Sequence, residues 1–357
     1  MTGRVLVCAL VVGVVGCEAP YDVQELSYDP SIGYLGTFYL YQPKADSART
    51  KRPAILAIHG GGFQAGDKPW GAQFAKEFCP SGYVVVSINY RLAGRPNGNW
   101  PAQIQDVQNA LKYIRANAAR FRIDPNRIAS LGVSAGGHLA TMVALRDDPA
   151  GPQGRVNVAI NLDGQSDMTM RKTDGSDELL TRVLGHGPPW TDAELRDFST
   201  VTFARAEVSV LTIHGAGDDN VLVDQGERIT AALRAAGAET EFVRIEGREG
   251  NCHSDCWKVP RARRALHHFL GRTLGHDGNP DGLTVKDVLP GTLRAHPIRP
   301  GDPVCRPPKD RRPRRPPSRR GRTRGPGRDG ARSRGCAREH GRGEKAHTPP
   351  GRGIFRL

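Results

Sequence analysis

Residues 127–140 read Arg-Ile-Ala-Ser-Leu-Gly-Val-Ser-Ala-Gly-Gly-His-Leu-Ala and carry the local signal that decides the fold. Their first six residues are typical of a buried strand, and apolar residues at the spacing of a helix face follow the last glycines. Between the two lies Gly132-Val133-Ser134-Ala135-Gly136, whose glycines leave room for a tight turn that lifts the Ser134 hydroxyl out of the sheet. The N–H of Ala135 then opens a helix, whose N-terminal dipole favours negative charge. The pattern predicts a nucleophile elbow, with an ordinary glycine-rich turn as the alternative.

The sequence around this stretch alternates apolar runs with helical patterns. Runs typical of strands buried on both faces cover residues 53–59, 83–88, 127–132, 156–162, 208–214 and 241–245, and residues 33–41 are typical of a strand near an edge. Apolar spacings of three and four indicate helices over 101–114, 139–143, 223–236 and 258–274. This alternation predicts an α/β fold with a mostly parallel central sheet and helices on both faces. The polar stretch 164–205 interrupts it and predicts a small lid-like insertion.

A second glycine-rich motif, His59-Gly60-Gly61-Gly62-Phe63, follows an earlier buried strand. Three glycines let the backbone approach a ligand closely and turn its N–H groups toward it. The oxyanion of an acyl-transfer reaction needs such preorganised donors, and losing one typically costs about 100- to 1000-fold in turnover. A flexible loop is the alternative for this motif alone. The two motifs together, each after a strand and in this order, predict an acyl-transfer enzyme.

A serine nucleophile needs a base, and the base needs an acid that orients it. His253 lies between the last predicted strand and the last predicted helix, where the base belongs if the chain order is Ser, acid, His. The acid then follows the preceding strand, where Asp218 is our first candidate and Asp219 the second. Asp163, which also ends a strand, is the third. His59 and His214 end strands as well, and we expect them to brace loops.

With these motifs in place, the chain resembles α/β-hydrolases of the hormone-sensitive-lipase-like group, and most closely the bacterial branch that includes acetylxylan and feruloyl esterases. The resemblance covers about residues 34–275 and is carried by residues 59–68, 87–92, 123–128, 132–140 and 214–218. It implies a serine esterase with Ser134 as nucleophile, Asp218 as acid, His253 as base, and Gly61, Gly62 and Ala135 as oxyanion-hole donors. It further implies short acyl esters, acetyl or feruloyl groups on plant polysaccharide, as substrates, and neither a metal nor an organic cofactor.

Two loops depart from the family pattern. Where the family continues its acid loop with a small residue and Val-Val-Pro, residues 219–222 read Asp-Asn-Val-Leu, which leaves Asp218 and Asp219 both open as the acid. Where the family places its base in a Gly-His-Gly-Phe-like loop, Cys252 and Cys256 flank His253. A metal site needs more ligands than these residues supply. In an exported protein, which meets an oxidising compartment, we expect a disulfide that encloses the base, with two free thiols as the alternative.

The N-terminus has the features of an export signal. Arg4 supplies a positive charge, and residues 5–17 are apolar or small, too short a run for a membrane-spanning helix, which needs about 20 residues. The end of the run, Val14-Val15-Gly16-Cys17, resembles a bacterial lipobox, in which the cysteine is diacylated and the chain is cleaved just before it. Residues 1–16 are thus predicted to be a lipoprotein signal peptide, and Cys17 to anchor the protein in the bacterial cell envelope. An ordinary signal peptide and a secreted product are the alternative.

The net charge of +14 belongs to the C-terminal tail. Residues 301–357 carry 18 Lys and Arg against 5 Asp and Glu, whereas residues 1–300 carry 33 against 32, so the basic net charge is weak evidence that the folded part binds nucleic acid, and we expect no specific nucleic-acid partner. We predict a linker over 17–33, a catalytic domain over 34–276, and a disordered Pro/Gly/Arg-rich tail over 277–357. The tail is interpreted as passive or as the product of an out-of-frame reading, ahead of a role in binding anionic surfaces.

Three functions fit these motifs. A serine ester hydrolase acting on a small-molecule or polysaccharide-linked ester is the main hypothesis. An amidase or formamidase on the same fold is the second, and a noncatalytic binding protein is the third. The sequence makes no prediction of oligomeric state.

Overall fold

The computed structural model describes residues 19–44, 51–170 and 177–275. By its internal contacts the chain divides into residues 1–293 and 294–357, and every described residue belongs to the first of these units. The predicted signal peptide, Cys17 and the tail over 277–357 lie outside the described residues.

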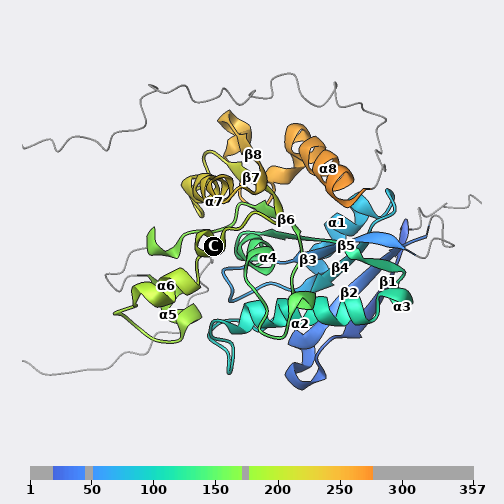
Figure 1. The fold of residues 1–357 in the computed structure, drawn as a ribbon, viewed down its shortest axis with the longest axis horizontal. Coiled ribbons are helices and arrows are strands. Elements are labelled where there is room, and N and C mark those ends of the chain that lie inside the picture. Colours follow the sequence, from blue (N-terminus) through green and yellow to red (C-terminus); the bar gives the residue numbers. More distant parts are fainter. Residues whose placement is uncertain (1–18, 45–50, 171–176, 276–357) are drawn as a thin grey trace, which may run out of the picture. The chain divides into compact units, whose positions relative to one another are not determined.

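An eight-stranded sheet in the order β1-β2-β4-β3-β5-β6-β7-β8 forms the centre of the fold (Figure 1). The strands are β1 Tyr21–Ser27, β2 Thr37–Pro43, β3 Arg52–Ile58, β4 Val84–Ile88, β5 Ile123–Val133, β6 Val158–Leu162, β7 Ser209–Gly215 and β8 Glu239–Ile245. Every neighbouring pair from β4 to β8 is parallel, whereas β2 is antiparallel to both β1 and β4. The predicted mostly parallel sheet is confirmed.

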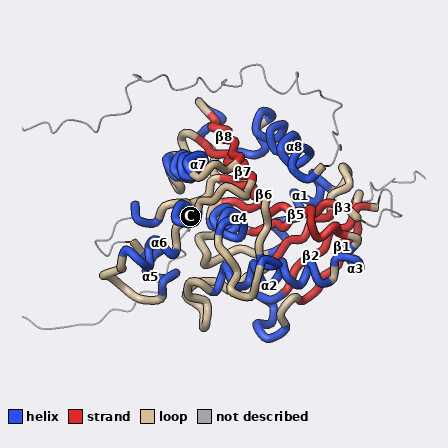
Figure 2. The backbone as a smooth tube through the Cα atoms, in the orientation of Figure 1, coloured by secondary structure: helices blue, strands red, loops and turns tan. Residues whose placement is uncertain are grey.

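Helices cover both faces of this sheet, as predicted (Figures 1 and 2). They are α1 Ala72–Phe78, α2 Ala102–Ala116, α3 Ala118–Phe121, α4 Ala135–Leu145, α5 Glu178–Leu184, α6 Asp192–Asp197, α7 Asp224–Ala235 and α8 Pro260–Leu274. One buried apolar cluster joins the sheet to α2, α4 and α7, and a second joins it to α1 and α8. Because the central strands β3, β4, β6 and β7 are buried between these two layers, they offer ligands only their ends. No helix among the described residues is long and apolar enough to cross a membrane.

The predicted linker over residues 17–33 was wrong for part of its length. Tyr21–Ser27 form β1, which pairs antiparallel with β2 and makes the edge of the sheet. The residues of this strand are exposed or half-buried. Because it buries no face, its sequence shows neither the apolar run nor the alternation of apolar and polar residues that predicts a strand. Backbone hydrogen bonds to β2 hold it instead. The strand predicted over 33–41 likewise begins only at Thr37, after a short 3-10 segment over Pro30–Gly36.

The insertion predicted over 164–205 is present between β6 and β7 and carries the short helices α5 and α6. Trp100 ties it to the body, because its Nε1 donates to Asp197 at 2.7 Å and its backbone N–H donates to Val183 at 2.7 Å. Arg146, at the end of α4, adds an ion pair to Asp197 at 2.9 Å. The insertion is therefore fixed to the layer of helices that contains α4, which begins at the elbow.

Candidate active site

Ser134 lies in the turn between β5 and α4. Its backbone φ of 54° and ψ of −122° place a non-glycine residue in a region that L-residues rarely adopt, which tight packing has to enforce. The flanking glycines show that packing: a Cβ on Gly132 would lie 2.1 Å from the Gly136 carbonyl oxygen, and one on Gly136 would lie 2.1 Å from the Ile58 carbonyl oxygen. The motif therefore needs glycine at both positions because strand and helix approach so closely.

The glycine-rich loop after β3 lies beside this turn. A Cβ on Gly60 would come within 3.3 Å of the Ser134 Cβ. Gly61 and Gly62 have φ of 108° and 58°, and among the described residues their N–H groups have no protein acceptor. The loop is braced by His59, whose Nδ1 contacts the Gly60 carbonyl oxygen at 2.8 Å. Two unpaired donors thus stand next to the serine, as an oxyanion site requires.

Asp218 and His253 are brought together from two loops at the carboxyl end of the sheet. His253 Nδ1 donates to Asp218 Oδ2 at 2.7 Å, while Asp218 Oδ1 accepts the backbone N–H groups of Asn220 at 2.9 Å and Val221 at 3.1 Å. The Asp218 side chain is fully buried, whereas Asp219 is exposed and makes no hydrogen bond to His253. With Nδ1 donating, Nε2 is the nitrogen left to take up a proton.

The environment of His253 makes it a stronger base. Burial opposes the charged imidazolium, but the hydrogen bond to Asp218 and the negative charges of Asp218 and Asp163 outweigh burial and raise the pKa of His253 above its usual value. An imidazole whose charged form is stabilised in this way suits a group that takes a proton from a hydroxyl and later returns it.

Asp163, our third candidate for the acid, follows β6 and is fully buried. Its Oδ1 accepts the N–H of Gly215 at 3.1 Å and its Oδ2 accepts the N–H of Ser254 at 3.1 Å. Burial raises the pKa of this carboxyl to about 7, the Gly215 hydrogen bond opposes the shift, and the charge of Asp218 adds to it. Asp163 therefore binds the backbone around the base and makes no hydrogen bond to the imidazole.

Cys252 and Cys256 form a disulfide, with their sulfurs 2.04 Å apart, that encloses His253. Cys256 is fully buried, and its Sγ would lie 3.0 Å from a Cβ on Gly215, at the end of β7. The expected disulfide is thus present and fastens the base loop to the strand that precedes Asp218. Cys79 is a free buried thiol, and burial raises its pKa to about 12.

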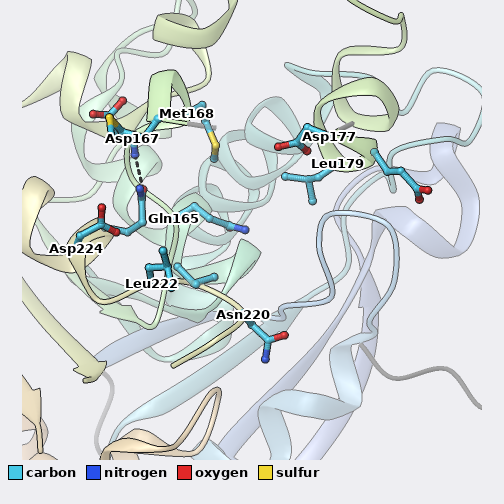
Figure 3. A pocket seen from close by; sticks show the side chains of 12 residues that line it. Gln165, Asp167, Met168, Asp177, Leu179, Asn220, Leu222 and Asp224 are labelled. Atoms are coloured by element: carbon cyan, nitrogen blue, oxygen red, sulfur yellow. Dashed lines mark hydrogen bonds between the residues drawn. The ribbon is translucent and has the colours of Figure 1, made fainter. Parts of the chain in front are cut away.

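A cavity of about 620 Å³ lies between the insertion and the loop that follows Asp218 (Figure 3), and its lining residues come from within 165–170, 177–179 and 220–225. Leu179 connects it to the glycine-rich loop, because its Cδ1 would lie 3.6 Å from a Cβ on Gly62. Asn220 and Val221, which bind Asp218, form part of another wall. Among the residues that the structure describes, the charged ones that line the cavity are acidic: Asp167, Asp177, Glu178 and Asp224. The side chain of Gln165 points into the cavity, and its buried Oε1 has no hydrogen-bond partner in the described part of the chain.

Comparison with known proteins places this site in a family. The model of the BD-FAE family matches residues 39–233, more than half of the chain, including the glycine-rich loop, the serine turn and Asp218. The chain belongs to the BD-FAE family. This agrees with the resemblance to hormone-sensitive-lipase-like α/β-hydrolases.

Relatives of this BD-FAE protein include two from Mycobacterium tuberculosis. Esterase LipC is 30% identical over 219 residues, 57% of this chain and 54% of LipC. Probable carboxylic ester hydrolase LipM is 32% identical over 196 residues, 51% of this chain and 45% of LipM. The chain thus spans about half the length of the curated relatives it matches.

Two solved structures are similar to the BD-FAE protein in fold. A truncated carbohydrate esterase from gut microbiota is 24% identical, with a TM-score of 0.64 over 72% of this chain and 98% of that one. The butyrate-bound esterase Est2 of Thermogutta terrifontis is 23% identical, with a TM-score of 0.59 over 71% of this chain and 94% of that one. The fold of the BD-FAE protein is that of the α/β-hydrolases.

The other histidines near the site contact backbone carbonyl oxygens or neighbouring rings. His59 stacks on Tyr90 with ring centres 4.3 Å apart, and burial lowers its pKa to about 4. His138 is fully buried, contacts the Gln165 carbonyl oxygen through Nδ1 at 3.1 Å, and has a pKa lowered to about 4 by burial. His214 Nε2 lies 2.7 Å from the Val221 carbonyl oxygen. The loop-bracing roles expected for His59 and His214 agree with these contacts.

A metal could in principle be held by Asp163, His214 and Asp218, whose ligand atoms lie within 4.8 Å of one another. The hydrogen bonds of these residues already engage both oxygens of each carboxylate and Nε2 of His214.

Sequence reasoning missed two features of the site. The bridge from Asp163 to Ser254 joins residues far apart in the chain, and only the position of Asp163 at a strand end pointed to it. The cavity with Gln165 and Leu179 depends on how the insertion lies against the acid loop. The sequence marked the insertion as polar but contained no signal for the side chains that line the cavity.

Proposed function

We propose that this BD-FAE protein hydrolyses carboxylic esters through an acyl-enzyme formed on Ser134. The observation that carries the proposal is the 2.7 Å hydrogen bond from His253 to the buried carboxylate of Asp218, in a fold that also presents a serine on a strained turn beside unpaired backbone donors. Nucleophile, acid and base follow one another along the chain as Ser134, Asp218 and His253, the order typical of α/β-hydrolases. The names of the relatives, esterases and a carboxylic ester hydrolase, support the same reaction.

In the proposed reaction, Ser134 Oγ attacks the ester carbonyl carbon while its proton passes to His253 Nε2. Asp218 stabilises the imidazolium, and the N–H groups of Gly61, Gly62 and Ala135 bind the oxyanion. The C–O bond to the alcohol then breaks, and the alcohol leaves with the proton from the imidazolium. Water, deprotonated by the same imidazole, then attacks the acyl-enzyme. The bond to Ser134 Oγ breaks, the imidazolium returns its proton to this oxygen, and the carboxylic acid is released.

We propose short acyl esters as substrates, with acetyl or feruloyl groups on plant polysaccharide as the natural class. The family resemblance supports this class, and so does the name of one structural relative, a carbohydrate esterase. The cavity supports an uncharged substrate in particular. A carboxylate placed there would face Asp167, Asp177, Glu178 and Asp224, whereas a hydroxyl could both donate to these acids and accept from the Gln165 amide.

We also propose export and a lipid anchor at Cys17. The proposal is supported by the charged start and apolar run of residues 1–17 and by the Cys252–Cys256 disulfide, a bond that persists in oxidising compartments. Expression from Met1 in a bacterium tests it by detergent partition and by the mass of the mature N-terminus. Acylated Cys17, lost in Cys17→Ser, is the expected result, and an unmodified N-terminus elsewhere would contradict the anchor.

Turnover of p-nitrophenyl acetate tests the function. The wild-type protein is expected to release p-nitrophenol, and Ser134→Ala is expected to lower kcat by at least about 10⁴-fold while the fold is kept. Ser130→Ala is the matched control, because it removes a buried hydroxyl from the same strand that binds only backbone carbonyls. No turnover by the wild type on any acyl ester would favour a binding protein, and turnover of p-nitroacetanilide in preference to the ester would favour an amidase.

A further inference from the structure

The loop that carries His253 has little regular structure of its own. Residues 251–255 lie between two short 3-10 segments, Gly247–Gly250 and Cys256–Lys258. Ser254, next to the base, has a φ of 72°, an uncommon conformation for a side chain other than Asn, Asp or Gly. A loop of this kind keeps one geometry only if other parts of the fold hold it, and the position of the imidazole depends on those contacts.

Asp163 supplies such a contact from the neighbouring strand end. It follows β6, its own N–H donates to Ile213 of β7 at 3.0 Å, and its φ is 51°. One carboxylate oxygen accepts from Gly215, at the end of the strand that precedes Asp218, and the other accepts from Ser254. A single side chain thus joins the segment that leads to the acid with the loop that carries the base.

Burying the Asp163 carboxylate costs free energy, so filling space in the core does not explain why an acidic residue stands at this position. The group is fully buried, and Asp218 and His253 are the charged or titratable side chains that act on it most strongly. A second carboxylate beside Asp218 is disfavoured by repulsion and by loss of hydration unless it is paired. Two backbone N–H groups offset this cost at Asp163, and both belong to the segments that hold the acid and the base.

We propose that Asp163 is a positioning residue, which fixes His253 against Asp218 by bridging the backbone of Gly215 and Ser254. The role rests on the proposed hydrolase reaction, in which His253 is the base. Asn cannot replace Asp163 in it, because an amide offers one acceptor and one donor where the site presents two N–H donors. Above about pH 7, where the Asp163 carboxyl is ionised, Asp163→Asn therefore loses one half of the bridge as well as a negative charge near the imidazole.

The test compares Asp163→Asn with Asp255→Asn, which removes an exposed carboxylate from the same loop. In Asp163→Asn we expect kcat to fall by about 10- to 100-fold with little change in KM, since a misplacement of about 1 Å costs on this order. The acid limb of kcat/KM against pH is expected to move to lower pH, because Asp163 helps to raise the pKa of His253. Asp255→Asn is expected to leave both unchanged.

Two results would overturn the proposal. The first is a kcat close to that of the wild type. The second is a loss of kcat that follows a loss of folded protein and leaves the acid limb in place, which is the behaviour of a merely structural residue. Lack of ester turnover by the wild type would refute the proposed function instead, a distinct outcome.

Amide hydrogen exchange in the wild type tests the bridge independently, because it needs neither a folded Asp163→Asn variant nor ester turnover. The amide of Ser254 is expected to exchange slowly, together with that of Gly215, because both bind the same buried carboxylate. A Ser254 amide that exchanges as fast as that of exposed Asp255 would show that the bridge does not hold the loop.

Discussion

Asp218→Asn is expected to change which ring nitrogen of His253, the proposed base, carries the proton. In the wild type, Oδ1 of Asp218 accepts two backbone N–H groups, and Oδ2 accepts Nδ1–H of His253. The oxygen of an Asn side chain is expected to keep the two backbone donors, because an NH₂ group there would face both of them. The amide nitrogen then faces His253 and, as a donor, requires Nδ1 to be unprotonated. The neutral imidazole must carry its proton on Nε2, the nitrogen that has to accept the proton of Ser134.

The magnitude follows from this change of tautomer. In the Ser-His-Asp template, the same substitution leaves the geometry intact and lowers kcat by about 10⁴-fold, or about 5.5 kcal/mol of transition-state stabilisation. We expect a loss of this order for Asp218→Asn on p-nitrophenyl acetate near pH 7, with KM changed far less. Asp219→Asn is the matched control, since it removes the neighbouring exposed carboxylate and is expected to retain most of the activity. A larger loss in Asp219→Asn, or a loss below about tenfold in Asp218→Asn, would refute the assignment of the acid.

Three further outcomes are expected. Reduction of the Cys252–Cys256 disulfide, or the double substitution Cys252→Ser and Cys256→Ser, is expected to lower kcat by roughly tenfold or more, because the loop that carries His253 loses its link to β7. Full activity in the reduced protein would contradict this. Because the raised pKa of His253 must be passed before the base is neutral, the acid limb of kcat/KM is expected to have its midpoint above about pH 6.5, and a midpoint below that value would argue against the His253–Asp218 pair. Glu178→Gln and Asp224→Asn are each expected to raise the ratio of kcat/KM for a succinyl ester to kcat/KM for a butyryl ester by about two- to fivefold, and added salt should reduce this effect. An unchanged ratio would show that the succinyl carboxylate does not bind in the cavity.

The parts of the fold that the sequence predicts are those whose signal is local. Strands β3, β4, β6 and β7 are mostly apolar runs, and the serine turn needs glycine at positions 132 and 136 because backbone atoms occupy the space of a Cβ. Strand β1 carries no such signal, since its residues face solvent for most of their length and its partner alone defines it. Helix α1 was not predicted either; it is short, and Phe74 and Phe78 reveal it only once packed against the sheet.

The sequence likewise predicts some residues of the site but not the contacts between them. Chain order was enough to nominate Asp218 and His253, and strand-end position was enough to nominate Asp163. The sequence left Asp218 and Asp219 open, because adjacent residues in a loop differ only in which way the loop turns them. Burial of one side chain and exposure of the other separate them. The bridge from Asp163 to Ser254 and the lining of the cavity arise from segments that meet only in the folded chain.

Covalent labelling of the nucleophile tests the central claim most directly. The wild-type protein is treated with diethyl p-nitrophenyl phosphate, digested, and mapped by mass spectrometry, beside Ser134→Ala as the matched variant. We expect a single diethyl phosphate on the peptide that contains Ser134, in proportion to the loss of esterase activity, and no label in Ser134→Ala. Labelling of another residue at the same rate, or complete inactivation with Ser134 unmodified, would contradict the claim that this chain is a serine hydrolase acting through Ser134.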